Sequence, residues 1–339
     1  MKLDVNVLRY MSQEEFRVLT AVEMGQRNHQ IVPVQLVESI AGLRHGGTFK
    51  LIRNLLRHKL LHHENTSYDG YRLTPLGYDY LAIKALLQRG SITSVGRQIG
   101  VGKESDIFEV ANDEGEIMVL KLHRLGRTSF RAVKQKRDYL QNRTQFSWLY
   151  LSRLSAVKEF AFMKALGENG FPVPRAIETN RHCVLMSMCD GFPMTQIRKL
   201  GNPGVVYKTM MNIIVRLGQH GLIHCDYNEF NLIIDDNEEV TMIDFPQMVS
   251  TKHANAEDMF NRDADCIRRF FRRRYDYRAE DDPEIEPGWP RFEDVVSDSH
   301  SIDKELKASG FSGKMQADLD KFIEAAEKEG DEGEGEEEE

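Results

Sequence analysis

A segment in the second half of the chain, residues 224–244, constrains the fold most. Two apolar runs, 232–234 and 240–243, flank a turn rich in Asp and Asn, and this pattern predicts a β-hairpin. Because the turn lies midway between the runs, Asn231 and Asp244 are expected to face each other at the open end of the hairpin. An amide oxygen beside a carboxylate suits a hard octahedral cation such as Mg²⁺, so the segment predicts a metal site.

Asp226 strengthens this interpretation. It lies five residues before Asn231, on the loop that enters the hairpin, and so within reach of the same metal site. A carboxylate in that place is suited to act as the base or water-orienting group of phosphoryl transfer. His224 is expected to be an orienting structural residue. The alternative is three polar residues that merely end loops, but the spacing and the hairpin together favour the functional interpretation.

The stretch 99–108 holds two glycines between β-forming residues. A Walker A loop is excluded because Arg97 and Glu104 stand where that motif needs Gly and Ser or Thr. The residues that follow predict a turn and then a strand that ends in Lys121. This order is typical of the phosphate-covering hairpin and lysine of a kinase N-lobe. Glu159, on an amphipathic helical stretch, is the candidate partner of the lysine, and a solvent-facing Glu is the alternative.

Residues 1–74 predict a small winged-helix domain. Ser12 begins a capping-box sequence, the segment 48–60 predicts a second clear helix, and a turn through Asp69 and Gly70 predicts a hairpin after it. On a helical wheel, one side of the second helix collects Phe49, Ile52, Leu55 and Leu56, and the other collects Lys50, Arg53, Asn54 and Arg57.

The stretch 40–63 contains five Lys or Arg and no acid. A basic helix face of this kind can bind the phosphates and grooves of a nucleic acid. The alternative is that Lys and Arg simply fill a solvent-exposed face. The absence of acids favours nucleic acid, without a choice between RNA and DNA.

The net charge of −8 is concentrated at one end of the chain. Residues 331–339 hold seven acids and no base, which leaves a net charge of −1 for the rest of the chain. Their Gly/Glu composition predicts a disordered tail.

The four cysteines form no C-x-x-C pair, which argues against a zinc site or a disulfide framework. No apolar run is long enough to span a membrane, and the first residues lack the apolar core of a signal peptide. We therefore expect neither a membrane protein nor a secreted one.

Five longer motifs make the chain resemble the RIO family of atypical serine/threonine kinases, and in particular its second, eukaryotic subfamily, which carries an N-terminal winged helix. The motifs are GKESDI (102–107), LKLHRLGRTSFR (120–131), SWLYLSR (147–153), HCDYNEFN (224–231) and IDFPQ (243–247). The resemblance runs from about Leu8 to about Tyr277. It implies an α+β protein in which a winged-helix domain precedes a bilobal, trimmed protein-kinase-like domain and an acidic disordered tail.

The resemblance also implies where the domains divide. The implied parts are a winged-helix domain (1–74), a linker helix (75–90), a kinase N-lobe (91–187) with a basic flexible loop (126–146), a C-lobe with a C-terminal helix (188–328) and the tail (329–339). In this family the flexible loop is a site of autophosphorylation and of contact with RNA or the ribosome, which here points to Arg127 and Arg131.

The implied cofactors are ATP and Mg²⁺, and the motif positions carry the family's site residues over to this chain. Lys121, Asp226 and Asp244 are the implied catalytic residues, and Asn231 and Asp244 are the implied metal ligands. The resemblance also implies that Lys121 forms the N-lobe ion pair with Glu159. The residues implied to bind the nucleotide are Gly100, Val101, Gly102, Lys103, Glu104 and Ser105 over the phosphates, and Met186, Ser187, Met188 and Cys189 at the adenine hinge.

Departures from ordinary protein kinases shape the functional prediction. Cys225 replaces the Arg that docks a phosphorylated activation loop, Pro246 replaces the glycine after Asp-Phe, and no Ala-Pro-Glu segment is found. An ATP site without a peptide platform favours an enzyme that uses ATP on itself. Family members look like ATPases that pass the γ-phosphate to the metal-site Asp, here Asp244, and then hydrolyse it. The alternatives are a conventional kinase acting in trans and an RNA-binding scaffold that ATP stabilises.

The cellular role follows from the resemblance alone. Subfamily members act in the last maturation steps of the small ribosomal subunit. The implied partners are the pre-ribosomal small subunit, its rRNA and ribosome assembly factors, with a cytoplasmic location, nuclear shuttling left open, and a monomeric state. The expected rRNA contacts of the winged helix are Lys50, Arg53 and Arg57. A third basic stretch, 268–274, serves either RNA or pairing with the acids in 280–286, and 314–328 predicts a helix that folds back on the ATP site or docks independently.

Overall fold

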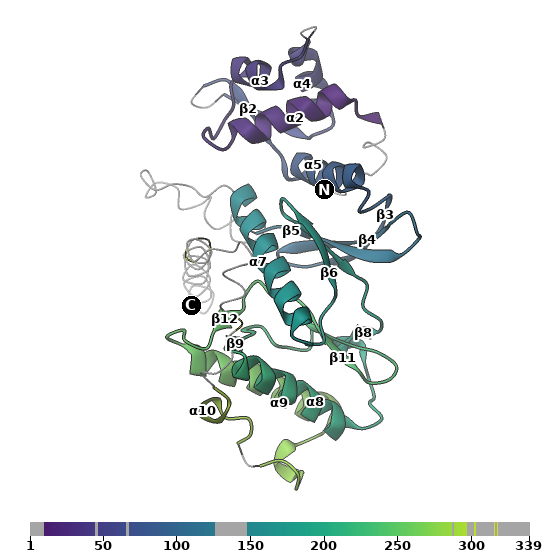
Figure 1. Ribbon diagram of the computed structural model, residues 1–339, viewed down its shortest axis with the longest axis vertical. Coiled ribbons are helices and arrows are strands. Elements are labelled where there is room, and N and C mark those ends of the chain that lie inside the picture. Colours follow the sequence, from purple (N-terminus) through teal and green to yellow (C-terminus); the bar gives the residue numbers. More distant parts are fainter. Residues whose placement is uncertain are drawn as a thin grey trace, which may run out of the picture. The chain divides into compact units, whose positions relative to one another are not determined.

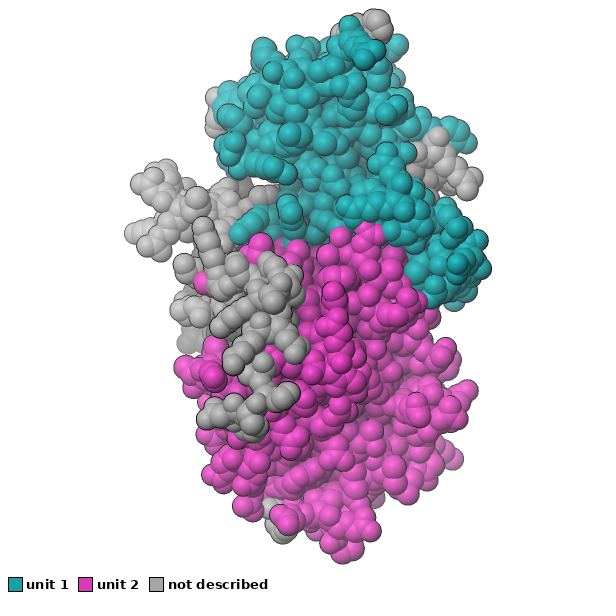
Figure 2. Space-filling model, viewed as in Figure 1, with its two compact units in different colours: residues 1–127, 141–153, 180–183 teal, residues 128–140, 154–179, 184–339 magenta. Residues whose placement is uncertain are grey.

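A computed structural model describes residues 10–44, 47–65, 68–125, 148–286 and 288–296, together with Ile302, Met315 and Ala317 (Figure 1). The chain divides into two compact units (Figure 2). Unit 1 comprises residues 1–127, 141–153 and 180–183, and unit 2 comprises residues 128–140, 154–179 and 184–339. Within the described residues, no helix combines the length and the apolar character needed to cross a bilayer. The predicted basic loop (126–146) and acidic tail (329–339) lie outside the described residues.

Unit 1 begins with helices followed by a hairpin, in the order that the winged-helix prediction requires. Its first elements are α2 (Gln13–Gly25), α3 (Val34–Ala41), α4 (Thr48–Arg57), β1 (Leu61–Glu64), β2 (Gly70–Leu73) and α5 (Pro75–Arg89). The predicted capping box is confirmed: the Ser12 hydroxyl accepts a hydrogen bond from the Glu15 amide at 3.2 Å, and the Glu15 carboxylate accepts one from the Ser12 amide at 2.7 Å. Strands β1 and β2 pair antiparallel, with Leu61 opposite Leu73.

Helix α4 corrects one expectation. Ile52 and Leu55 are buried in the winged-helix core, as predicted, but the side chain of Phe49 is 54% exposed. Residues four positions apart share a helix face, and Phe49 therefore lies beside Arg53, whose guanidinium carbon stands 5.2 Å from the centre of the ring. Phe49 therefore belongs to the basic face of α4. Thr48, and not Phe49, is buried together with Ile52 and Leu55.

The rest of unit 1 is built on three strands that pair antiparallel in chain order: β3 (Ser94–Val101), β4 (Ser105–Ala111) and β5 (Ile117–His123). Gly100 lies opposite Ile107, and Ile107 lies opposite Lys121. Strand β4 alternates between buried and half-buried residues, as expected of a strand with one face on the core. Helix α7 (Trp148–Glu168) begins in unit 1 and continues into unit 2.

Unit 2 holds the remaining elements, apart from residues 180 and 183 at their strand ends, which belong to unit 1. These elements are β6 (Ala176–Asn180), β7 (Cys183–Ser187), β8 (Phe192–Pro193), η2 (Met194–Gln196), α8 (Pro203–Gln219), β9 (Leu222–Ile223), β10 (Leu232–Ile234), β11 (Val240–Met242), β12 (Val249–Ser250), α9 (Ala256–Tyr275), η3 (Ala279–Asp281) and α10 (Phe292–Val295). Helices α8 and α9 lie side by side (Figure 1) and pack through Tyr207 and Phe271, whose ring centres are 5.3 Å apart. The predicted hairpin at 232–243 is confirmed as β10 and β11, with Leu232 opposite Met242.

Candidate active site

The loop between β9 and β10 carries Asp226, whose half-buried carboxylate is held by two amide side chains. Asn231 donates from Nδ2 to Oδ2 of Asp226 at 2.7 Å, and Asn228 donates from Nδ2 to Oδ1 at 2.8 Å. Burial raises the pKa of Asp226 above its ordinary value, the nearby Asp244 carboxylate adds to the rise, and the two amides oppose it. Asp226 is therefore a fixed carboxylate with raised basicity, as a general base requires.

Asp263, on helix α9, holds the same loop from the opposite side. Its Oδ2 accepts the backbone N–H of Cys225 at 2.8 Å, and its Oδ1 accepts that of Tyr227 at 3.1 Å. These residues flank Asp226, so the buried Asp263 fixes the backbone on both sides of the catalytic candidate. Burial raises the pKa of Asp263 to about 6. The sequence prediction missed Asp263, although an acid next to Ala264 on the buried face of an amphipathic helix is unusual enough to mark it.

Arg262, next to Asp263, donates from Nη2 to the carbonyl oxygen of Cys225 at 2.6 Å. Cys225 therefore has its N–H and its C=O bound by two consecutive residues of α9. Its backbone has φ +68°, in the left-handed region that costs energy for any residue with a side chain. Burial raises the pKa of its thiol to about 12, which makes Cys225 a packing residue rather than a nucleophile.

The open end of the β10–β11 hairpin brings the two predicted metal ligands together. The amide of Ile243 donates to the carbonyl of Asn231 at 3.0 Å, which closes the hairpin next to Asp244. Asn231 is 8% exposed, and Asp244 has φ +70°, a second left-handed residue in the site. Because Nδ2 of Asn231 is bound to Asp226, its Oδ1 remains to act as a ligand beside the Asp244 carboxylate. This pair of hard oxygen donors fits Mg²⁺, which takes one or two protein ligands and completes its shell with phosphate and water.

The turn between β3 and β4 carries the predicted phosphate-covering residues. Val101, Gly102, Lys103 and Glu104 are exposed, and Gly100 and Ser105 are half-buried. The Gly102 amide donates to the Ser105 carbonyl at 2.8 Å, which closes the turn. At Gly100 a Cβ atom would lie 3.3 Å from the side chain of Ile107, so a larger residue would crowd the opposite strand.

Arg124 anchors this turn to a buried charge cluster in unit 1. Its amide donates to the Glu104 carbonyl at 2.6 Å, and its Nε donates to Asp106 at 3.0 Å. Its two terminal nitrogens donate to the two carboxylate oxygens of Asp79, on α5, at 2.6 and 2.7 Å. Burial alone would raise the pKa of Asp79, but the charge of Arg124 and the hydrogen bonds from His182 and Arg124 outweigh it and lower the pKa.

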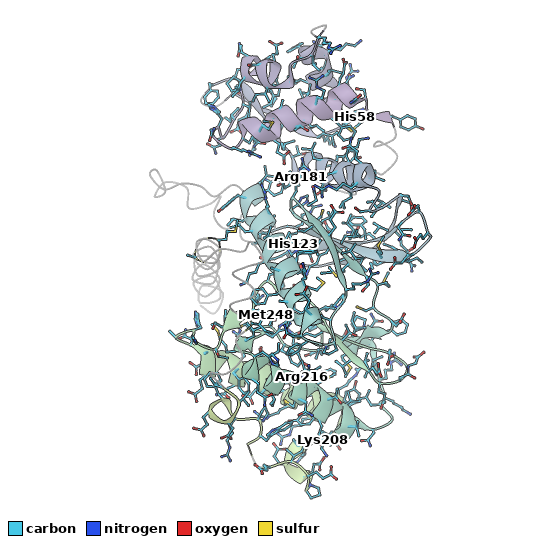
Figure 3. All side chains as sticks on the ribbon, in the orientation of Figure 1. His58, His123, Arg181, Lys208, Arg216 and Met248 are labelled. Atoms are coloured by element: carbon cyan, nitrogen blue, oxygen red, sulfur yellow. The ribbon has the colours of Figure 1, made fainter. Side chains whose placement is uncertain are left out.

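Two histidines and an arginine complete the surroundings of this cluster. His182 is fully buried, which lowers its pKa, and its Nε2 lies 2.7 Å from Asp79. His123, at the end of β5, donates its amide to the His182 carbonyl at 2.8 Å. Arg181, which is labelled in Figure 3, forms two hydrogen bonds of 2.8 Å with Glu23 of α2. The segment 180–183 is therefore bound to α2 through Glu23 and to α5 through Asp79. No local sequence pattern predicted this cluster.

The predicted lysine pair stays a prediction. Lys121 is 6% exposed on β5 and Glu159 is 1% exposed on α7. Lys121 belongs to unit 1 and Glu159 to unit 2. Burial of both side chains is consistent with charges that have partners, since unpaired buried charges are costly.

The predicted adenine hinge begins in the last two residues of β7 and continues beyond it. Met186 is buried, Met188 is exposed, and Ser187 and Cys189 are half-buried. The Ser187 amide already donates to the Arg175 carbonyl at 3.0 Å, and its hydroxyl accepts from the Arg175 amide at 2.9 Å. The backbone N–H of Ser187 is therefore engaged within the protein, and Met188 and Cys189 lie beyond the end of β7, where backbone groups can face an adenine.

The predicted nucleic-acid residues of α4 are exposed. Lys50, Arg53 and Arg57 all lie on the solvent side of the helix, which also carries Phe49. Arg127 and Arg131 lie outside the described residues. The exposed cations of α4 are compatible both with nucleic acid and with a solvated face.

Comparisons with known proteins agree on one family. A family model described as "RIO domain" matches residues 106–284, and one described as "Rio2, N-terminal" matches residues 8–89. The serine/threonine-protein kinase rio2 of Dictyostelium discoideum is 56% identical over 319 residues, which cover 94% of this chain and 60% of that protein. The rio2 kinase of Schizosaccharomyces pombe is 49% identical over 323 residues, which cover 94% of this chain and 92% of that protein.

One solved structure is similar over almost the whole chain. It is the Rio2 kinase–ADP/Mg²⁺–phosphoaspartate complex from Chaetomium thermophilum, with a TM-score of 0.84 and 48% identity, and the match covers 96% of this chain and 99% of that one. The family matches and this likeness confirm the predicted order of a winged-helix domain followed by a kinase-like domain.

Proposed function

The chain belongs to the RIO family of serine/threonine-protein kinases, and from that premise we propose that it uses ATP with Mg²⁺ to phosphorylate itself and to drive a conformational switch. The observation that carries the proposal is that hydrogen bonds fix both the carboxylate of Asp226 and the backbone on either side of it. Asp263 binds the backbone on both sides of it, and Asn228 and Asn231 bind its two oxygens. So much buried structure devoted to one carboxylate is expected of a catalytic group.

Each residue of the site has a role that its position allows. Asp226 accepts or directs the proton of the attacking group. Asn231 and Asp244 hold Mg²⁺, which neutralises charge on the phosphates when bound. Lys121 and the turn at 100–105 bind the phosphates, and the segment 186–189 binds adenine through its backbone. The buried Asp263 and Arg262 keep the catalytic loop in place between turnovers.

The finer proposal is that Asp244 accepts the γ-phosphate. A carboxylate oxygen of Asp244 forms a bond to the γ-phosphorus while the bond to the β–γ bridging oxygen breaks and ADP leaves. Water then attacks the phosphorus of the acyl phosphate, its proton passes to Asp226, and inorganic phosphate leaves Asp244. Support comes from the phosphoaspartate named in the Chaetomium thermophilum structure and from the left-handed backbone of Asp244, a strained conformation of the kind found in active sites.

Labelled ATP tests this step. Purified protein is mixed with Mg²⁺ and γ-labelled ATP, and label is followed on protein and in free phosphate, with and without hydroxylamine. We expect protein-bound label that hydroxylamine releases, that turns over into phosphate, and that Asp244→Asn abolishes. The matched control is Asp236→Asn in the exposed β10–β11 turn, which should behave as wild type. Stable label on serine or threonine with little free phosphate would instead indicate a kinase that acts in trans.

We extend the proposal to the partners and place of action. The chain acts in the cytoplasm as a monomer, with nuclear shuttling left open, on the pre-ribosomal small subunit, where it contacts rRNA and ribosome assembly factors. The support is the family resemblance and the exposed cations of α4, since binding through Lys and Arg releases counterions from RNA. Sedimentation of the purified chain tests the monomeric state, and a stable dimer would contradict it.

The RNA contact has its own experiment. Replacing Lys50, Arg53 and Arg57 together with Glu should weaken binding to small-subunit rRNA and lower the slope of log affinity against log salt by about 3. ATP affinity should not change. A control that replaces the exposed Arg27, Lys164 and Lys252 with Glu has the same charge change outside α4. If both triple variants bind RNA equally well, α4 is only a solvated face.

A further inference from the structure

Unit 2 contains a cavity of about 560 Å³ away from the predicted nucleotide residues, between α9, η3 and Tyr207 of α8. Its wall is rich in guanidinium groups, which come from Arg262, Arg268, Arg269, Arg272 and Arg278. Three carboxylates, those of Asp258, Asp265 and Glu280, also line it. The cations outnumber the acids by two, and the surplus corresponds to the charge of one phosphate monoester near neutral pH.

Of these five arginines, only Arg268 and Arg272 have a carboxylate within 4 Å among the described residues. Arg268 pairs with Asp265 at 2.7 Å and donates its other terminal nitrogen to the Trp289 carbonyl at 2.8 Å. Arg262 donates to the Cys225 carbonyl, which is a neutral acceptor. Arg272 stands 3.9 Å from Glu280, and both side chains are largely exposed, so this pair is weak. Within the described part of the chain, no hydrogen bond or ion pair involves the guanidinium of Arg278. Arg272 and Arg278 therefore have N–H groups free to turn toward an anion.

Tyr207 adds a polar group to the wall. Its side chain is 1% exposed, and its hydroxyl makes no hydrogen bond of ordinary geometry to any described residue, although Arg268 lies near it. A buried hydroxyl without a partner is costly. A ligand oxygen in the cavity could accept its hydrogen bond.

The carboxylates on the wall limit the kind of anion that fits. An RNA backbone carries one charge on every nucleotide and would bring several phosphates against Asp258, Asp265 and Glu280. A single phosphate group can lie among the guanidinium groups and avoid them, with the charge-assisted, often bidentate hydrogen bonds that Arg forms with phosphate. The composition of the wall therefore favours one compact dianion over a polyanion.

We propose that this cavity, the α9 pocket, binds the phosphate group of a phosphorylated serine or threonine in a peptide segment, and that Arg262 relays its occupancy to the catalytic loop. Ordinary kinases dock a phosphate on the Arg next to the catalytic Asp, and Cys225 stands at that position here. Arg262 reaches the carbonyl of Cys225 from α9 and also lines the pocket. A phosphate that draws Arg262 inward competes with this hydrogen bond and so acts on the residue that precedes Asp226.

Binding is tested first, without catalysis. A short fluorescent Gly/Ser peptide with one phosphoserine is titrated with the full chain, beside the same peptide unmodified, and inorganic phosphate and single-stranded RNA are used as competitors. We expect the phosphopeptide to bind about tenfold more tightly than the unmodified peptide, and Arg272→Ala/Arg278→Ala to remove that difference. The control Arg273→Ala changes an exposed α9 residue outside the pocket and should have no effect. Equal binding of the two peptides, or binding of RNA alone at these arginines, would overturn the proposal.

The relay is tested by ATP turnover, and this part rests on the proposed function. Phosphopeptide should change the turnover of wild-type protein about twofold or more and should leave Arg272→Ala/Arg278→Ala at its basal rate. Phosphopeptide that binds without any effect on turnover would refute the relay. Absence of ATP turnover in the wild type would count against the proposed function instead, while the binding experiment would still decide whether the pocket takes phosphate.

Discussion

The two units each contain a buried carboxylate that positions part of the candidate site, and the two differ in what they face. Asp79 in unit 1 meets the guanidinium of Arg124, and its pKa is lowered. Asp263 in unit 2 meets two backbone N–H groups, and burial raises its pKa to about 6. Similar burial thus gives opposite shifts in pKa. The charge of Arg124 and the hydrogen bonds from Arg124 and His182 outweigh the desolvation of Asp79, whereas the two amides and the nearby Arg262 do not outweigh that of Asp263.

The difference extends to how each carboxylate supports the site. Asp263 binds the catalytic loop directly, through the amides of Cys225 and Tyr227. Asp79 acts indirectly. It binds the side chain of Arg124, and the backbone N–H of Arg124 donates to the carbonyl of Glu104 in the phosphate-covering turn. We therefore expect changes at the Asp79 cluster to appear mainly in stability, and changes at Asp263 mainly in turnover.

The largest expected effect is on the stability of unit 1. Arg124→Met removes the cation of two buried carboxylates, Asp79, which keeps His182 as a partner, and Asp106, and breaking buried pairs in this way costs about 3–5 kcal/mol. Urea unfolding followed by Trp148 fluorescence in a Trp289→Phe background measures it, since Trp148 lies in unit 1. The double variant Asp79→Leu/Arg124→Met, which leaves only Asp106 without its cation, should recover part of the loss. A single variant as stable as wild type would show that the cluster is not a paired charge.

The next effect is on catalysis. Asp263→Ala leaves the amides of Cys225 and Tyr227 without their acceptor and frees the backbone around Asp226. A displacement of about 1 Å of a catalytic group lowers turnover about 100-fold. The measurement is kcat for ATP hydrolysis, with circular dichroism to check the fold. Glu257→Ala removes an exposed acid from the first turn of the same helix and serves as the control. Turnover within a few-fold of wild type would show that Asp263 does not position the catalytic loop.

The catalytic half of the site was predictable because it is local. Asp226, Asn231 and Asp244 lie on one hairpin and its entry loop, so apolar runs and a turn sufficed to place them. Asp263 escaped prediction because it contacts Cys225 from 38 residues away. The Asp79–Arg124 pair is separated by 45 residues, and sequence spacing does not show which distant charges meet on burial.

The fold was predictable to a similar degree. The capping box at Ser12 and the hairpin after α4 depend on neighbouring residues and were placed correctly. Phe49 was assigned to the apolar face because it lies at the boundary between the two faces on a helical wheel and is itself apolar, whereas the helix buries Thr48 and leaves Phe49 beside Arg53. Tertiary packing decides such borderline positions.

The pH dependence of stability separates the two carboxylates by sign. For Asp263 the folded pKa of about 6 exceeds the ordinary 3.8, so wild type loses stability relative to Asp263→Asn as pH rises from about 4 to about 6. For Asp79 the folded pKa lies below 3.8. Its advantage over Asp79→Asn therefore holds through that window and is lost only as pH falls below about 4. Thermal unfolding of the three proteins across pH checks both signs, and parallel curves would show that the two environments do not differ.

The smallest expected effect concerns Asp226. Burial raises its pKa, and hydrogen bonds from two side-chain amides oppose the rise. Asn228 donates to its Oδ1 at 2.8 Å and so stabilises the charged form. Asn228→Ala removes this neutral donor and leaves the Asn231 bond in place, so the pKa of Asp226 should rise further above its ordinary value. Because the ionised carboxylate is the base, we expect the acid limb of the pH–rate profile to move to higher pH, with turnover near neutrality reduced about threefold. The adjacent Glu229→Ala is the control. An acid limb that stays in place or moves to lower pH would mean that neutral donors do not set the basicity of Asp226, and that the Asp244 carboxylate and burial alone do.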